Sequence, residues 1–353
     1  MRRGRAEDGI AHSMNRRQNE RDRQTPESAR RRRVAILALA LHTLLSAGTY
    51  LAAKGTLQTL DPLHVALFRF VTATGIMTAL ALPMRSFRAL AREKRLIGLG
   101  LLTVPLNQLL FLEGIQLSTP THAALLYSLT PGTVFALSLA LRTEPFDRLR
   151  AAGLLAALAG VLWVLAERGL DLSRGPLRGD LLIFGAMVSW SVFSVLAKPL
   201  VARHGAIPVT AWTFIWGTAA FLPVGLWSVR SLDPSTVTPA AWGGILYLAI
   251  LTSVVAYFLW SWCLKRLDAT QVAIFTDLQV PLTAALSIWL FHEAMTRALV
   301  YGGLVTLAGV TLTVLRPGGS GKASHPRPSD PNPRVLRARS PASRGFSRRR
   351  RTE

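Results

Sequence analysis

The chain has 353 residues, of which 50% are hydrophobic and 17% are charged, and its formal net charge at pH 7 is +22. Its mean hydropathy of +0.32 is high for a water-soluble protein. A single cysteine, Cys263, excludes an internal disulfide, and the sequence has no HExxH, P-loop or GxSxG motif and no spaced set of Cys and His. No catalytic residue, metal site or cofactor is therefore expected.

Ten apolar stretches follow one another along the chain. Each is close to the ~20 residues with which an α-helix crosses a hydrocarbon core about 30 Å thick. The expected spans are 34–53, 62–84, 96–117, 121–141, 151–166, 180–200, 207–229, 240–264, 269–291 and 298–315. Lipid offers no hydrogen bonds to exposed peptide groups, so helices are favoured. The predicted fold class is an all-α, polytopic integral membrane protein with ten transmembrane helices.

The distribution of positive charge predicts how these helices are oriented. With the N-terminus inside, 34 of the 41 Lys and Arg residues lie in the two tails and the inside loops, and six lie in the outside loops. This asymmetry matches the positive-inside rule. We therefore expect a multi-pass protein of the cell membrane (plasma or inner membrane) with both termini in the cytoplasm.

The two ends of the chain differ in composition from the spans. Residues 1–33 and 316–353 are rich in Arg, Ser and Pro and poor in aromatic residues, which predicts basic, disordered cytoplasmic tails. Their Arg clusters are expected to lie against the anionic headgroups of the lipid bilayer. Nucleic acid is the less favoured partner and is not expected.

The sequence repeats itself at an offset of about 150 residues. The offset of 150 aligns Pro131 with Pro281, and an offset of 149 aligns the two copies of LAGV, at 158–161 and 307–310. Residues 34–167 and 179–315 are therefore predicted to be two related domains of five helices each. Because five is an odd number, the second domain enters the membrane from the opposite side. Inverted repeats of this kind serve alternating access in transporters.

These motifs resemble the drug/metabolite transporter superfamily, in particular its ten-helix EamA-type members. The resemblance covers about 34–315 and rests on YLAAK (50–54), SVLAK (194–198), LFRF (67–70), TPTHAALLYSLTP (119–131) and DATQVAIFTDLQVP (268–281). It implies two EamA-like five-helix repeats and the transport of a small molecule, with export favoured over import. The first helix departs from the family pattern because it lacks the Trp that Trp190 supplies in the second half.

An acid and a proline, Asp277 and Pro281, stand inside the apolar stretch 269–291. A charged acid at that depth costs roughly 2.5–3.5 kcal/mol unless it faces water or a partner. Pro281 removes the helical hydrogen bond to the carbonyl of Asp277. The pair predicts a polar notch beside a wet cavity, with Asp277 as a proton site or as the counter-charge of a cationic substrate. A protonated acid that bonds a neighbouring helix is the structural alternative.

The second and fourth spans carry further candidates. Pro131 frees the carbonyl of Tyr127, whose hydroxyl would lie at the position that mirrors Asp277, so helices four and nine are predicted to wall the pathway. Arg69 lies roughly 10 Å deep in the second span. It is predicted either to contact substrate or to form a structural ion pair, and it could pair with Asp277 in one conformation.

Several polar or aromatic residues are candidates because of their depth. Asn107 and Tyr257 occupy matching positions in the repeat and are expected to hydrogen-bond a ligand, and Trp190 is deep enough to stack on one.

Other residues are expected to be structural or secondary. Lys54 and Lys198 end helices, where a cation favours the negative end of the helix dipole, and Glu113 lies near water. The isolated His122 is expected to be an interior histidine with satisfied partners. Glu293 is expected to favour the N-terminus of the helix that follows it.

Transport is the function that this pattern favours. The leading interpretation is a secondary transporter, with export preferred, of a small metabolite or drug-like molecule, with protons as a candidate coupling ion; a homodimer is left open. The alternative is an integral-membrane enzyme that acts on a lipid-linked substrate, which would need clustered catalytic groups near one interface. A membrane scaffold is a third class, and it does not explain an acid beside a proline in the middle of a span.

Overall fold

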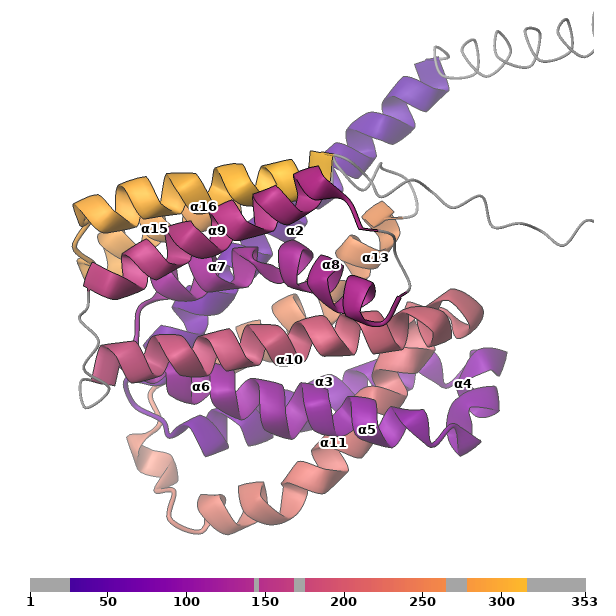
Figure 1. Ribbon diagram of the computed structural model, residues 1–353. Helices are drawn as coiled ribbons and strands as arrows, with labels where there is room; N and C mark the ends of the chain where they lie inside the picture. The colour runs from indigo at the N-terminus through magenta and orange to yellow at the C-terminus, as the bar shows by residue number, and fades with distance from the viewer. Residues whose placement is uncertain (1–25, 143–145, 168–174, 265–277, 316–353) are drawn as a thin grey trace, which may run out of the picture. The chain divides into compact units, whose positions relative to one another are not determined.

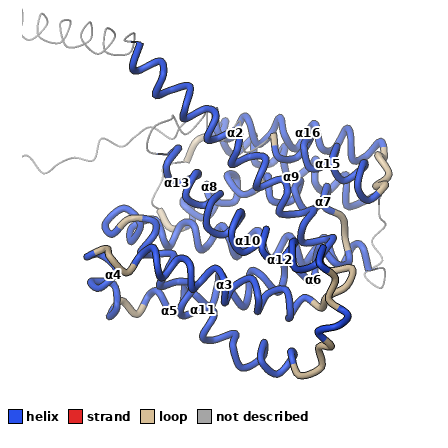
Figure 2. Tube along the Cα trace, turned by 180° about the vertical axis from the view of Figure 1, so that it is seen from behind, coloured by secondary structure: helices blue, strands red, loops and turns tan. Residues whose placement is uncertain are grey.

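The computed structural model describes residues 26–142, 146–167, 175–264 and 278–315, and all regular structure in these ranges is helical. Eight helices there are long and apolar enough to cross a membrane, and two shorter apolar helices, Gln279–Phe291 and Arg297–Thr313, follow them. They fall in the order of the ten expected spans. Figures 1 and 2 show this helical bundle from its two sides. Both expected tails lie largely or wholly outside the described residues.

The first five spans contain α2 (Pro26–Thr56), α3 (Pro62–Ala81), α4 (Arg85–Ala89), the 3₁₀ turn η1 (Leu90–Arg92), α5 (Arg95–Leu101), the π-helical η2 (Leu102–Leu106), α6 (Asn107–Leu117), α7 (Pro120–Ser128), α8 (Thr130–Ala140) and α9 (Arg148–Glu167). Here α5, η2 and α6 form one span, and α7 and α8 form another that is interrupted at Leu129.

The described part of the second five contains α10 (Gly175–His204), α11 (Ala206–Val229), the 3₁₀ turn η3 (Pro234–Thr236), α12 (Pro239–Leu246), the π-helical η4 (Tyr247–Ala256), α13 (Tyr257–Leu264), α15 (Gln279–Phe291) and α16 (Arg297–Leu315).

Three helices begin with the same local device, a side-chain cap followed by proline. The side chains of Asp61, Thr119 and Thr238 each accept a hydrogen bond from a backbone N–H in the first turn of α3, α7 and α12. The cap satisfies a donor that the helix leaves open, and a proline at the first position lacks only an N–H without a helical partner. These residues set where three spans begin.

Two spans contain a π-helical stretch at matching places in the sequence. The first is η2, which includes Pro105, and an offset of 150 carries it to 252–256, within η4. A π-helical turn changes which side chains share a helix face and is often found at functional sites.

Helices of the two expected halves pack against one another in a regular scheme. The main pairs are α9 with α16, α3 with α11, α7 with α15, α2 with η4, and α10 with α6. When each helix is replaced by the helix at the same place in the other half, the same set of pairs results. Figure 1 shows α16 lying along α9, and α10 beside α6.

The pair α9 and α16 meets along a seam of glycines. A Cβ on Gly153 would lie 2.7 Å from the carbonyl oxygen of Gly309, and one on Gly160 would lie 2.5 Å from that of Gly302. Small residues allow such close backbone approach between membrane helices. As α9 advances from Gly153 to Gly160, its partner goes back from Gly309 to Gly302, so the two helices run antiparallel.

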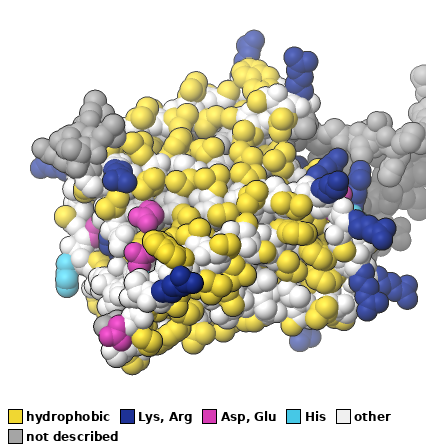
Figure 3. Space-filling model, turned by 90° about the horizontal axis from the view of Figure 1, so that it is seen from below, with side chains coloured by type: hydrophobic (Ala, Val, Ile, Leu, Met, Phe, Trp, Pro, Cys, Tyr) yellow, Lys and Arg dark blue, Asp and Glu magenta, His cyan; other side chains and the backbone are white. Residues whose placement is uncertain are grey.

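Much of the surface of the bundle is apolar. Leu155 and Trp227, for example, are 67% and 68% exposed. Figure 3 shows one face on which hydrophobic side chains fill the area between the two ends, while Lys and Arg gather at the end where α4 lies. An apolar belt between polar ends is the surface that a bilayer requires.

Candidate functional site

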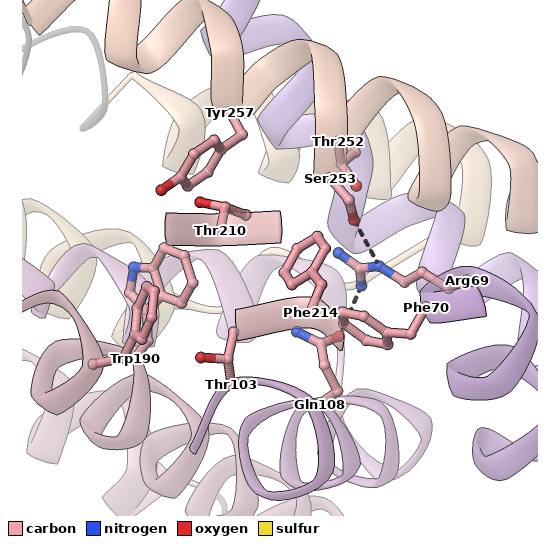
Figure 4. A pocket seen from close by; sticks show the side chains of 11 residues that line it. Arg69, Phe70, Thr103, Gln108, Trp190, Thr210, Phe214, Thr252, Ser253 and Tyr257 are labelled. Atoms are coloured by element: carbon pink, nitrogen blue, oxygen red, sulfur yellow. Dashed lines mark hydrogen bonds between the residues drawn. The ribbon is translucent and has the colours of Figure 1, made fainter. Parts of the chain in front are cut away.

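A cavity of about 90 Å³ lies between helices of both halves, and we call it the central cavity. Its walls come from α3, η2, α6, α10, α11, η4 and α13. The lining residues are Arg69, Phe70, Thr103, Gln108, Trp190, Phe193, Thr210, Phe214, Thr252, Ser253 and Tyr257. Most of these residues lie near the middle of their spans, so the cavity is at mid-membrane depth. Figure 4 shows Arg69 with Gln108 and Ser253 at one side, and Trp190, Thr210 and Tyr257 at the other.

Arg69 is the only residue of this lining that is charged at neutral pH. Its side chain is 7% exposed. Nη1 donates to Oε1 of Gln108 at 2.8 Å, and Nε donates to Oγ of Ser253 at 3.2 Å. Both partners are neutral, and in the described part of the chain no carboxylate pairs with the guanidinium. The central cavity therefore carries a net positive charge from its described residues.

A chain of amides extends from Arg69 into the bundle. Gln108 donates from Nε2 to Oδ1 of Asn107 at 2.9 Å. Asn107 in turn donates to the carbonyl of Ala186 at 2.6 Å and to the hydroxyl of Tyr127 at 3.3 Å. Because the amide of Gln108 is held from both ends, its oxygen is oriented toward the guanidinium.

The far side of the central cavity is aromatic and contains two neighbouring hydroxyls, those of Thr210 and Tyr257. Trp190 and Phe193 pack together with ring centroids 5.3 Å apart. Thr210 is 2% exposed, and among the described residues its Oγ1 has no partner in a well-formed hydrogen bond. Figure 4 shows this hydroxyl next to the hydroxyl of Tyr257, on the same side of the pocket. Hydroxyls inside a cavity that are not held by a well-formed hydrogen bond can bind a ligand or water.

The π-helical stretches supply matching hydroxyl groups to the cavity. Thr103 in η2 and Ser253 in η4 are 150 residues apart and both line it. Ser253 donates to the carbonyl of Leu248, five residues earlier, which is the spacing of a π-helical turn, while its oxygen accepts from Arg69. The distortion of η4 therefore positions one partner of the arginine.

The structure brings five of the six substrate-binding candidates to the central cavity or next to it, but its described lining contains neither Pro131 nor Pro281 and no residue of α7, α8 or α15, the helices that were expected to wall the pathway. Arg69, Trp190 and Tyr257 line the central cavity, and Asn107 and Tyr127 join it through Gln108. The sixth candidate, Asp277, lies outside the described residues.

The two prolines have different local settings. Pro131 is in the first turn of α8, just after the break at Leu129, and the freed carbonyl of Tyr127 accepts a hydrogen bond from Oγ1 of Thr130 at 2.6 Å. Pro281 lies in the first turn of α15, which begins at Gln279. A proline in a first turn removes no helical hydrogen bond of the described helix.

The secondary candidates separate into structural and exposed groups. Nζ of Lys54 donates to the carbonyls of Ile115, Gln116 and Ser118, at 3.0, 2.8 and 2.7 Å, so it caps the end of α6 rather than of its own helix α2. Lys198 and Glu113 are exposed. Of the three, Lys54 has the clearest structural role.

Glu293 differs from its expected role. Its Oε2 accepts hydrogen bonds from the hydroxyls of Thr121 in α7 and Ser287 in α15, both at 2.6 Å. The cap of α16 is instead Thr296, whose Oγ1 accepts from the backbone N–H of Leu299. Glu293 lies about one turn before Thr296, which is too far from the first residue of α16 to cap that helix.

Sequence reasoning did not find a buried acid at the end of the bundle that contains Lys54. Asp180 in α10 is 0% exposed; one carboxylate oxygen accepts from the hydroxyl of Ser118, and the other lies 3.1 Å from Nδ1 of His122 in α7. We call these three residues the acid–histidine cluster. Asp180 was assigned to the boundary of a span, where a carboxylate is ordinary, so no signal marked it as buried. His122 has the satisfied partners that were expected of it.

The described residues offer no group of three or more His, Cys, Asp or Glu side chains that could hold a metal ion. In the acid–histidine cluster the carboxylate stands between serine and histidine. A serine nucleophile needs the histidine next to its hydroxyl, so this order does not activate Ser118.

The profile of the EamA-like transporter family matches the chain twice, at residues 33–166 and 177–315. The chain is 30% identical to an uncharacterized transporter of Archaeoglobus fulgidus, over 79% of this chain and 97% of that protein. It is 23% identical to the uncharacterized transporter YyaM of Bacillus subtilis, over 76% and 91% of the two chains. A WAT1-related protein of Arabidopsis thaliana is 25% identical over 61% and 63%.

One similar solved structure is described only as the crystal structure of a protein. It is 22% identical, with a TM-score of 0.56, and the match covers 80% of this chain and 96% of that chain. At this identity the likeness concerns the fold alone.

Proposed function

Because the chain belongs to the EamA-like transporter family, and is therefore a multi-pass, all-α membrane transporter, we propose that it is a secondary transporter that exports a small molecule by alternating access. The proposed location is the cell membrane, with both termini in the cytoplasm. The basic loop with Arg85, Arg88, Arg92, Lys94 and Arg95 supports this orientation, since it falls on the inner side.

The observation that carries the proposal is the central cavity at mid-membrane depth. A buried guanidinium is expensive in a membrane, and such residues usually line a substrate or ion pathway. Arg69 comes from the first half, Ser253 and Trp190 from the second, and Gln108 links the guanidinium to the amide chain. A binding site between two halves is where alternating access requires it.

Contacts between the halves at one end of the bundle support a closed side. His122 of the first half meets Asp180 of the second, and Thr121 of the first half donates to Glu293 of the second. In the proposed orientation these residues are at the outer ends of α7, α10 and α15. They would have to separate when the transporter opens outward.

The antiparallel pair α9 and α16 supports the inverted relation of the repeats. An offset of 149 exchanges the glycine contact Gly153–Gly309 with Gly302–Gly160, so each contact maps onto the other. Helices five and ten are therefore related by the exchange of halves and run in opposite directions.

Sealed vesicles that contain the purified protein test the proposal. They are loaded with a defined mixture of amino acids, organic acids, amines, nucleosides and sugars, and the contents are measured by mass spectrometry over time. We expect at least one solute to leave chemically unchanged, faster than from empty vesicles, and Arg69→Gln to slow this loss at least tenfold. If vesicles with the protein retain every solute to the same extent as vesicles without it, transport of these classes of solute would be refuted. Conversion of a solute into a product would favour the membrane-enzyme alternative.

A second experiment tests the orientation. After Cys263→Ala, single cysteines at Ser235 and at Lys94 are labelled in intact cells with a reagent that does not cross membranes. We expect label at position 235 and none at position 94. The opposite pattern would show that the orientation is the reverse of the proposed one. Label at both positions would contradict the ten-helix topology.

A further inference from the structure

We propose that the central cavity selects a substrate that bears a negative charge, and that Arg69 is the residue which binds this charge. The inference rests on the proposed transport function and deepens it, because it names the chemical class of the substrate. It comes from the charge balance and the open hydrogen-bond donors of the cavity.

The charge balance of the lining is the first step. Of the eleven lining residues, Arg69 alone is ionised at neutral pH, and its two side-chain partners, Gln108 and Ser253, are neutral. A guanidinium remains protonated in proteins, so it cannot relieve its burial by losing a proton as a lysine can. A buried cation with neutral partners is costly, and an anion that pairs with it offsets this cost.

The open donors of Arg69 are the second step. A guanidinium has five N–H groups, and Nε and Nη1 each use one in the contacts with Ser253 and Gln108. Within the described residues, Nη2 makes no hydrogen bond. A carboxylate accepts two parallel hydrogen bonds from the edge formed by Nη1 and Nη2, which is the strongest arrangement this pair of groups makes.

The opposite wall indicates the rest of the substrate. Trp190 and Phe193 provide apolar and aromatic surface there, and the neighbouring hydroxyls of Thr210 and Tyr257 offer polar contacts. A cation is disfavoured here because it would lie close to Arg69 in a medium that screens charge poorly. The lining therefore suits an organic anion with a small apolar body.

The volume shows that this conformation is not the one that holds a full substrate. The central cavity measures about 90 Å³. A cavity of ~150 Å³ is known to hold benzene in another protein. The cavity must widen on binding, as alternating access requires.

Ligands that differ only in charge test the proposal. The purified protein in detergent is heated with benzoate, benzamide or benzylamine, and with butanoate, butanamide or butylamine, and the midpoint of unfolding is recorded. We expect at least one of the two anions to raise the midpoint by several degrees and to bind at least tenfold more tightly than its neutral and cationic analogues. Equal stabilisation within each set, preference for the amines, or no effect of any compound would overturn the inference.

Variants that keep the fold make the test specific. Gln108→Glu places a carboxylate beside the guanidinium and replaces the donor to Oδ1 of Asn107 with an acceptor, so we expect loss of anion binding in a protein that still unfolds in a cooperative transition, with a lower midpoint. Arg69→Gln should also lose anion binding, whereas Arg178→Gln, an exposed residue of α10, should keep it. Retention of anion binding by both Gln108→Glu and Arg69→Gln would overturn the role of Arg69.

A double-mutant cycle addresses Asp277 as a counter-ion. If Arg69 binds the substrate and does not pair with Asp277, the effects of Arg69→Gln and Asp277→Asn on the unfolding midpoint should add. If the double variant is as stable as either single variant, the two residues are paired, and the inference fails.

Flux separates this inference from the proposed function. Movement of neutral or cationic solutes, but not of the anions, through vesicles with the wild-type protein would refute anion selectivity and leave transport intact. No movement of any solute would refute transport itself.

Discussion

Nδ1 of His122 lies 3.1 Å from a carboxylate oxygen of Asp180, and this contact joins α7 to α10 across the two proposed halves. The other carboxylate oxygen accepts from Ser118 at the end of α6, so one buried acid connects three helices. Its own surface is completely buried. The cluster is therefore a structural contact between the halves, at the end of the bundle that we propose to be closed.

Removal of this acid should destabilise the protein strongly. Asp180→Ala leaves His122 and Ser118 without a shared partner inside the bundle, and we expect a loss of about 3–5 kcal/mol in the free energy of unfolding. Ser118→Ala removes one hydrogen bond only and should cost about 1 kcal/mol. Unfolding by denaturant in mixed micelles measures both. The exposed acid Glu113, replaced by Ala, is the matched control and should change the stability little; equal losses for Asp180→Ala and Glu113→Ala would contradict the prediction.

The glycine seam between α9 and α16 predicts a sharp dependence on side-chain size. A methyl group at Gly160 would lie 2.5 Å from the carbonyl oxygen of Gly302, so Gly160→Ala should force the helices apart and cost about 1–3 kcal/mol or more. Gly75 in α3 has nothing within 4 Å of the same position. Gly75→Ala should therefore be neutral or stabilise the fold by up to roughly 1 kcal/mol. Unfolding midpoints of the two purified variants compare them, and a stable Gly160→Ala protein would show that the seam is looser than described.

The two lysines should behave differently although both lie near helix ends. Lys54→Met keeps an unbranched side chain of nearly the same length but removes the donors to three carbonyls of α6 and its C-terminal cap, so we expect a loss of about 1.5–3 kcal/mol. Lys198 is exposed, and Lys198→Met should stay within roughly 0.5 kcal/mol of the wild type. The measurement is again the free energy of unfolding. Similar values for both variants would mean that the carbonyl contacts of Lys54 contribute nothing net.

The charge of the proposed substrate predicts a response to voltage. Export of a monoanion from a compartment with a negative interior gains about 2.3 kcal/mol for each 100 mV. In vesicles loaded with benzoate, a potassium gradient with valinomycin sets the potential, and efflux should rise as the interior becomes more negative. Efflux that does not depend on the potential would mean that the anion moves together with a cation such as a proton. Vesicles with Arg69→Gln serve as the control.

The positions of the spans could be predicted from the sequence because membrane insertion depends on local hydrophobicity. The caps Asp61, Thr119 and Thr238, each followed by proline, are also visible in the sequence, because a cap depends only on neighbouring residues at the start of its own helix. The depth of Arg69 also follows from its distance to the end of one apolar stretch. These properties need no knowledge of which helices are neighbours.

The partners inside the bundle could not be predicted in this way. Gln108 and Ser253 become partners of Arg69 because three helices converge on one point, and the π-helical turn of η4 directs Ser253 toward it. For Ser253, the one signal in the sequence was its position 150 residues after Thr103, at the matching place of the repeat. Asp180 stands at the start of an apolar stretch, so only its neighbours in other helices reveal that it is buried.

The antiparallel contact of α9 with α16 limits how the protein can move. Backbones that touch at two levels, Gly153 with Gly309 and Gly160 with Gly302, cannot slide past one another without a clash at one of them. They can still rotate slightly about the line on which they meet. In the alternating access that we propose, this pair is thus suited to act as a fixed pivot about which the remaining helices turn.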